Sequence, residues 1–339
     1  MTEHVVSTHA LTRRYGERVA VDGVSLTVHR GEIYGFLGPN GAGKTTTLRM
    51  LLGLIRPTSG RATVLGGRPG APEVLRRVGS LVETPGFYPY LSGRENLRVL
   101  ARYRGLDDGA VEAALYQVDL TSRAKDRYRS YSLGMRQRLG VAAALLGQPD
   151  LLILDEPTNG LDPAGMADMR DLVRSLAAVG QTVVLSSHLL GEVEQVCDRV
   201  GVVAGGRLLV EGGVAELRST RSLVLRVDPL VAAVPVAHRF AGAAQVSTED
   251  DQLRVAVDPA RAPELVRALV AADVDVHEVR TADRSLEDVF FAVTAPSNGT
   301  APTSATEISE PSRLNEQGRL TEQGRLTEQG RLTEKGRAV

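Results

Sequence analysis

The chain has 339 residues, of which 42% are hydrophobic. This composition is enough to bury a core, and the length allows more than one domain. The 40 basic and 41 acidic residues nearly cancel, so no overall field favours nucleic acid as a partner or direct adsorption to an anionic membrane. Partners must therefore be recognised locally, and nucleic acid is not expected among them.

The single cysteine, Cys197, excludes an internal disulfide and is typical of a reducing compartment. The longest weakly polar stretch, residues 141–154, is broken by polar residues and is shorter than the roughly 18 to 20 residues that span a bilayer. The first ten residues lack the charged and apolar regions of a secretion signal. We expect a cytoplasmic protein that reaches the inner face of the cell membrane only through a partner.

Short strands and turns are predicted from residue 4 to about 66, around a glycine-rich loop. The loop follows the apolar run 33–37 and precedes the helix-like run 47–54, which is the setting that the phosphate-binding pattern GxxxxGK[ST] needs. Its residues are Gly38, Pro39, Asn40, Gly41, Ala42, Gly43, Lys44, Thr45 and Thr46. We read this loop as a nucleoside triphosphate site.

The residue types of this phosphate loop suit that chemistry. Glycines at 38, 41 and 43 can take positive φ and bring backbone N–H groups close to phosphate oxygens, at the positive end of the following helix. Lys44 supplies a point charge for the β- and γ-phosphates, and Thr45 a hydroxyl for Mg²⁺. A glycine-rich turn that binds nothing is the alternative.

Helical periodicity follows over residues 91–146, and short apolar runs then appear at 151–154 and 182–185 with helical stretches between them. This alternation indicates an α/β fold with a parallel sheet that is buried on both faces. The runs 200–203 and 207–210 flank Gly205 and Gly206, which predicts a hairpin.

From about residue 221 the sequence predicts a small α+β domain. Strands are expected at 222–227, 253–257 and 274–279, and helices at 263–272 and 286–293. After Thr294 the composition changes, and tandem hexapeptides occupy residues 313–337. A glycine and two charges stand in nearly every repeat, so we expect a disordered tail, with a partner-docking repeat as the alternative.

Two carboxylates, Asp155 and Glu156, end the strand predicted at 151–154. An acid at the carboxyl end of a parallel strand lies where ligands bind in open α/β sheets. Asp155 is placed to hold Mg²⁺ or its water shell, and Glu156 is the candidate general base for an attacking water. The alternative is that the pair only caps the next segment.

Over residues 4 to about 218 the chain resembles the ATP-binding cassette (ABC) ATPases, the nucleotide-binding subunits of ABC transporters. The resemblance implies that Tyr15 stacks on adenine, although a tyrosine beside Gly16 could also be an ordinary turn residue. Residues 131–138 resemble the family's signature segment and retain Ser132 and Gly134, which would hold a γ-phosphate. Two positions depart from its usual residues, Leu133 for a glycine and Met135 for a glutamine.

Two further segments resemble motifs of this family. Residues 160–163, which include Asp162, resemble the D-loop, and Ser187-His188 resembles the switch histidine segment. Because His188 follows the strand predicted at 182–185, its imidazole would project toward the γ-phosphate. The other five histidines are assigned to surface or packing roles.

The family usually has glutamine at the position of Glu83, where it touches the Mg²⁺ and water region and leads into the surface that meets the membrane subunit. A carboxylate there, followed by residues 86–97, is similar to the subgroup that exports or gives immunity to peptide antibiotics such as bacitracin and lantibiotics. Residues 286–291 resemble the accessory domain of daunorubicin-type drug-resistance ATPases. Efflux is therefore favoured over nutrient uptake.

The resemblance implies a P-loop ABC-type nucleotide-binding domain at 1–218, with a parallel-sheet core, an antiparallel β subdomain and a helical subdomain at about 90–150. An accessory α+β domain would occupy 219–296 and the tail 297–339. Two copies would pair head to tail, so that ATP lies between the Lys44 loop of one copy and the Ser132 segment of the other, and a polytopic membrane permease would be driven by closure and reopening. A non-transport ABC ATPase with a regulatory or assembly role remains the alternative.

Overall fold

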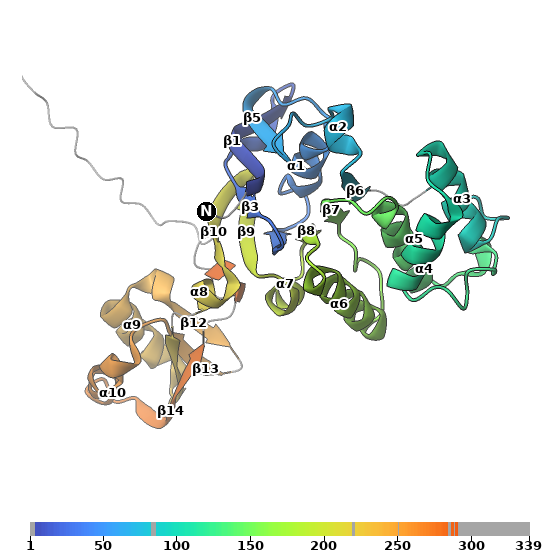
Figure 1. Cartoon of the computed structure of the whole chain (residues 1–339). Coiled ribbons are helices and arrows are strands. Elements are labelled where there is room, and N and C mark those ends of the chain that lie inside the picture. The colour runs from blue at the N-terminus through green and yellow to red at the C-terminus, as the bar shows by residue number, and fades with distance from the viewer. Residues whose placement is uncertain are drawn as a thin grey trace, which may run out of the picture. The chain divides into compact units, whose positions relative to one another are not determined.

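The computed structural model describes residues 4–82, 86–218, 221–249, 251–283, 286–287 and 289–290 (Figure 1). Glu83 and the hexapeptide tail lie outside the described residues, as does part of the helix predicted at 286–293; of that helix, the four described residues are helical. In the part of the chain that the structure describes, no helix combines the length and the apolar character that a bilayer crossing needs.

A six-stranded sheet forms the centre of the nucleotide-binding region, and five of its strands run parallel. In spatial order its strands are β10 (Arg207–Gly213), β9 (Arg199–Ala204), β4 (Ile33–Leu37), β8 (Thr182–Ser187), β7 (Leu151–Asp155) and β6 (Val78–Leu81). Strand β10 pairs antiparallel with β9, as the hairpin prediction required. The predicted parallel strands are confirmed, and the carboxyl ends of β4, β7 and β8 therefore meet at one edge of the sheet.

A second, antiparallel sheet surrounds the long strand β1 (His4–Tyr15). Its other strands are β2 (Arg18–Val24), β3 (Thr27–His29) and β5 (Ser59–Val64). Helix α1 (Lys44–Leu51) buries Leu48, Met50 and Leu51 in a cluster that this sheet shares with one face of the six-stranded sheet. The start of α1 is thereby fixed beside the end of β4.

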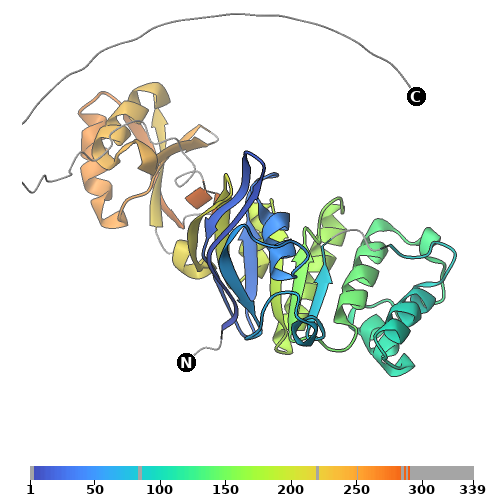
Figure 2. The same cartoon turned by 90° about the horizontal axis from the view of Figure 1, so that it is seen from above.

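Helices α3, α4 and α5 pack together as a group (Figures 1 and 2). Their bounds are Gly93–Tyr103 for α3, Asp108–Gln117 for α4 and Leu133–Leu145 for α5. A capping box between Ser92 and Glu95 starts α3, and the hydroxyl of Ser132 starts α5 by accepting the Met135 N–H. The helical periodicity predicted for residues 91–146 is confirmed.

The remaining elements of this region are shorter or follow the sheet strands. They are α2 (Pro72–Leu75), the 3-10 turn η1 (Tyr128–Ser130), α6 (Pro163–Ala178), α7 (Leu190–Val196) and α8 (Val214–Arg218). Helices α6 and α7 follow β7 and β8 along the chain, and their apolar sides enter the same buried cluster as Leu152, Leu154 and Leu185 of those strands.

The C-terminal region is an antiparallel sheet with two helices. Its strands, in spatial order, are β12 (Val246–Glu249), β13 (Gln252–Val255), β11 (Arg221–Asp228) and β14 (Asp275–Asp283). Helices α9 (Leu230–Ala241) and α10 (Ala262–Val270) bury their apolar sides against it, and the 3-10 turns η2 (Ala243–Gln245) and η3 (Pro259–Arg261) connect elements. The expected α+β character is present, whereas α9 and β12 were missed; the domain boundaries at 218 and 296 stay predictions.

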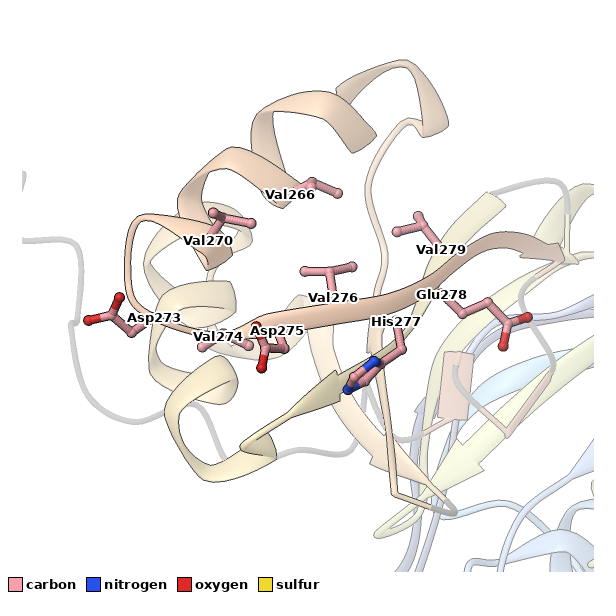
Figure 3. Close-up of a pocket in the computed structure, with 9 residues that line it drawn as sticks. All are labelled: Val266, Val270, Asp273, Val274, Asp275, Val276, His277, Glu278 and Val279. Carbon is pink, nitrogen blue, oxygen red and sulfur yellow. The ribbon is translucent and has the colours of Figure 1, made fainter.

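A register shift in β14 sets which of its side chains meet α10. Arg226 of β11 pairs with Glu278 and Val227 with Val276, so His277 is an extra residue at a β-bulge. Figure 3 shows the result: Val276 and Val279 lie on the α10 side of the strand, whereas His277 lies on the other side. A hollow of about 670 Å³ opens there between β14 and α10.

Candidate active site

The phosphate loop is the turn from β4 into α1, and glycine is required at three of its positions for two different reasons. Gly41 and Gly43 have φ values of +82° and +100°, which L side chains rarely adopt. Gly38 does not take positive φ, so that part of the sequence prediction is wrong. A Cβ atom on Gly38 would overlap the carbonyl oxygen of Val203 in β9, so close packing is the reason for glycine at this position.

Lys44, the first residue of α1, is buried, with 5% of its surface exposed. Its ammonium group donates to the carbonyl oxygens of Gly38 at 2.5 Å and Pro39 at 3.3 Å. The same nitrogen lies 3.0 Å from Oε1 of Glu156. These oxygen atoms therefore hold the ammonium group of Lys44 over the loop. From this position it could donate hydrogen bonds to phosphate oxygens.

Thr45 and Asp155 meet across 110 residues of chain. The hydroxyl of Thr45 donates to Oδ2 of Asp155 at 2.7 Å, and the other carboxylate oxygen accepts from Oγ of Ser186 at 2.5 Å. A hydroxyl and a carboxylate are the hard oxygen ligands that Mg²⁺ takes, usually with several waters and substrate phosphates. Among the described residues no group of three or more His, Cys, Asp or Glu forms a metal cage. This pair fits a Mg²⁺ ion that reaches the site with a nucleotide.

Glu156 follows β7 directly and has a left-handed backbone, with φ of +49°. The Ser186 hydroxyl accepts the N–H of Glu156 at 3.0 Å and so fixes this conformation. One carboxylate oxygen lies beside Lys44, and the other lies 2.7 Å from Nδ1 of His188, which follows β8. Glu156 therefore joins the ammonium group of the loop to the imidazole.

Tyr15 lies at the end of β1, and 45% of its surface is exposed. The guanidinium carbon of Arg13 lies 4.4 Å from the centre of its ring, a cation–π contact. Arg13 also donates to the carbonyl oxygen of Arg56 at 2.9 Å. The sequence analysis did not identify Arg13, because a stacking contact between residues of one strand leaves no motif.

Ser132, Gly134 and Asp162 belong to a different neighbourhood. The hydroxyl of Ser132 accepts the Met135 N–H at 3.3 Å, and Asp162 begins α6 by accepting the Gly165 N–H at 3.1 Å. Gly134 faces Leu161, the residue before Asp162. Within the described part of the chain, the side chains of Ser132 and Asp162 make no hydrogen bond to the phosphate loop.

The structure therefore brings together Lys44, Thr45, Asp155, Glu156 and His188, and keeps the Ser132 segment apart. Ser186, like Arg13, is a site residue that the sequence analysis missed. Its signal was a polar residue at the end of an otherwise apolar buried strand, directly before Ser187-His188. Glu83, the other predicted site residue of this region, lies outside the described residues.

A phosphate loop at the end of one parallel strand, with acidic residues and a histidine at the ends of its neighbours, defines a P-loop nucleoside triphosphatase. A family model described as "ABC transporter" matches residues 21–159. The chain belongs to the ATP-binding proteins of ABC transporters and is an ATPase of that family. The family and the fold class predicted from the sequence are thus confirmed.

Several relatives are similar over most of the chain. The bacitracin transport ATP-binding protein BcrA of Bacillus licheniformis is 43% identical over 293 residues, which cover 84% of this chain and 96% of that protein. The lantibiotic transport ATP-binding protein SrtF of Streptococcus pyogenes is 39% identical over 201 residues, 59% of this chain and 87% of that protein. A solved ATP-binding subunit of an ABC transporter superposes with a TM-score of 0.56 at 30% identity, covering 63% of this chain and 92% of that one.

Proposed function

We propose that this ATPase powers a separate polytopic membrane permease that exports an antibiotic, drug or lipid-like substrate. Relatives named for the transport of bacitracin and of a lantibiotic, at 43% and 39% identity, support this substrate class. The observation that carries the ATPase mechanism is the bridging position of Glu156, between Lys44 at 3.0 Å and His188 at 2.7 Å.

Each site residue has a separate task in hydrolysis. Lys44 and the loop N–H groups bind and orient the phosphates, and Thr45 and Asp155 hold Mg²⁺, which when bound neutralises the charge on the phosphates. Glu156 accepts the proton of the attacking water at a carboxylate oxygen, and His188 orients this carboxylate and contacts the γ-phosphate. Tyr15, held by Arg13, stacks on the adenine ring.

A second copy of the chain completes the site. The Ser132 segment forms the N-terminus of α5. Among the described residues its contacts are with Met135 and Leu161, and not with the phosphate loop of the same chain. Helix N-termini favour anions, so this end of α5 suits the γ-phosphate bound to another copy. Head-to-tail pairing puts two ATP molecules in the interface, and hydrolysis reopens it.

A groove of about 590 Å³ is the proposed contact with the permease. It lies among β6, α3 and α5, and its exposed apolar side chains are Leu54, Leu100 and Tyr103. Val82 and Gly86, which flank the segment 83–85 in the sequence, line the same groove. We therefore assign to Glu83 the coupling of the site to the permease, and a Glu83→Ala variant that exports normally in cells would disprove this role.

The Glu156→Gln variant tests the mechanism. Since the amide cannot take a proton from water, turnover should fall by at least about 10²-fold, while ATP binding persists and a closed dimer accumulates in size-exclusion chromatography with ATP. Glu112→Gln, an exposed partner of Arg94 in α4, is the matched control and should keep wild-type turnover. Wild-type turnover in Glu156→Gln would remove Glu156 as the base.

Copurification separates transport from the alternative function. If the tagged chain is recovered from detergent-solubilised membranes with a polytopic membrane protein, transport is supported. If it is recovered without one under conditions that preserve its ATPase activity, a regulatory or assembly ATPase is favoured.

A further inference from the structure

A hollow of about 730 Å³ lies where the chain leaves the end of α1 and turns into β5. Its accessible apolar lining includes Ile55 and Pro57, whereas Leu11 and Met50 are buried. Three arginines, Arg56, Arg61 and Arg68, line the same hollow, and no acidic residue does. We call it the arginine hollow.

The charge of the arginine hollow is uncompensated. Many other arginines of the described chain have carboxylate partners, such as Arg98 with Asp108 at 2.8 Å and Arg138 with Asp168 at 3.0 Å. Within the described residues none of the three arginines of the hollow has such a partner, and their sequence neighbourhood, 49–77, holds six arginines against one glutamate. Three guanidinium groups around one concave surface repel one another, and an anion between them removes this cost.

The backbone that carries these arginines is held in place. Gly53 and Gly70 pack backbone to backbone, and a Cβ atom on Gly53 would overlap Gly70. The carbonyl oxygen of Arg56 accepts from Nη1 of Arg13 at 2.9 Å. The arginine stems therefore start from fixed positions, which lowers the entropy cost of gathering their guanidinium groups around one ligand.

We propose that the arginine hollow binds the phosphate of an amphiphilic ligand, with the guanidinium groups on the phosphate oxygens and an apolar part of the ligand on Ile55 and Pro57. Guanidinium groups match phosphate geometry with two parallel hydrogen bonds, and they are less strongly hydrated than ammonium groups. The shared chemistry is a phosphate ester, which either the headgroup of an anionic phospholipid or a soluble phosphate ester can supply.

The position of the hollow favours the phospholipid. Gly53, after the end of α1, lines the arginine hollow, and the next residue, Leu54, lines the groove proposed for the permease. If the permease docks in that groove, the arginine hollow lies beside the membrane surface, where anionic headgroups are concentrated. This step rests on the proposed function, whereas the phosphate chemistry does not.

The test uses the full chain and two triple variants. The hollow variant removes the three positive charges of the hollow with Arg56→Gln, Arg61→Gln and Arg68→Gln. The control variant removes three exposed arginines outside the hollow with Arg102→Gln, Arg239→Gln and Arg267→Gln. Cosedimentation is measured with vesicles of phosphatidylglycerol and phosphatidylcholine, and with phosphatidylcholine alone. Titration calorimetry with glycerol 3-phosphate and with inorganic phosphate tests whether the hollow binds a soluble phosphate instead of a phospholipid headgroup.

Removal of the three charges should weaken binding to the phosphatidylglycerol vesicles about 100-fold, at about fivefold per arginine near an anionic surface, while the control variant binds like the wild type. Loss of glycerol 3-phosphate binding in the hollow variant alone would support the phosphate site and assign it to a soluble ester. If neither probe separates the two variants, the proposal is overturned.

The ATPase activity of all three proteins is measured in the same preparations. Within the described residues, the side chains of these three arginines make no hydrogen bond or ion pair with Lys44, Thr45, Asp155, Glu156 or His188. The Arg56 carbonyl that accepts from Arg13 belongs to the backbone and is kept on substitution. The hollow variant should therefore keep wild-type ATPase activity in the absence of vesicles. Failure of the proposed function would appear as recovery of the tagged, active chain without a polytopic membrane protein, and failure of the phosphate site as equal binding by the two variants.

Discussion

Replacement of Ser186 by alanine tests whether one hydroxyl organises both carboxylates of the site. Ser186 is fully buried; its Oγ donates to Asp155 at 2.5 Å and accepts the N–H of Glu156 at 3.0 Å. Loss of a bond to a charged group costs roughly 2 kcal/mol and loss of a neutral bond about 1 kcal/mol. Ser186→Ala should therefore lower the free energy of unfolding by about 3 kcal/mol.

Activity should fall in the same variant, because the left-handed backbone of Glu156 loses its support. Small displacements of a reacting group cost up to about 10²-fold in rate, so we expect kcat to fall roughly 10- to 100-fold, while KM for ATP changes less because Ser186 is not in the phosphate loop. Urea unfolding followed by circular dichroism and steady-state ATPase kinetics measure the two effects.

Ser175→Ala is the matched control for this experiment. Ser175 is an exposed residue of α6 whose hydroxyl donates to the carbonyl oxygen of Leu172 at 2.7 Å, so the same hydroxyl is removed without a contact to the carboxylates. It should cost less than about 1 kcal/mol and leave kcat unchanged. If Ser186→Ala matched Ser175→Ala in both stability and kcat, the organising role of Ser186 would be wrong.

Four further predictions concern other contacts. His188→Ala should keep ATP binding but lower kcat at least about tenfold, and equal kcat in steady-state assays would contradict its contact with Glu156. Arg13→Ala should raise KM for ATP about two- to fivefold with kcat unchanged, since an exposed cation–π contact contributes about 0.5 to 1 kcal/mol to holding Tyr15; an unchanged KM would refute this. Burial raises the pKa of the Cys197 thiol well above its usual range, so at pH 8 it should react with a disulfide reagent only after unfolding, and the free energy of unfolding should fall above about pH 8.5, where the unfolded thiol ionises. Gly35→Ala would place a Cβ atom 2.7 Å from Val193 and 2.9 Å from Sγ of Cys197, so it should destabilise the fold by about 1 to 3 kcal/mol, and less in a Cys197→Ala background.

The sequence alone was enough to identify the phosphate loop, the carboxylates at 155 and 156, and the parallel strands. These features are local: the loop needs its glycines, lysine and threonine within nine residues, and a buried strand needs a short apolar run. The helix α9 was missed because Val231, Val234 and Val236 favour strands and Pro235 disfavours a helix interior, and burial of its apolar side against the C-terminal sheet overrides these preferences.

What the sequence by itself determined is therefore the chemistry of the separate segments. Only the tertiary structure decided which segments meet, because strand order sets contacts such as the one between Thr45 and Asp155, 110 residues apart. Strand order also places the Ser186 hydroxyl between Asp155 and Glu156, and Gly38 against the carbonyl oxygen of Val203. The tertiary structure likewise brings Arg56, Arg61 and Arg68 around one hollow. Each of these depends on a neighbour that is distant along the chain, and no local pattern records it.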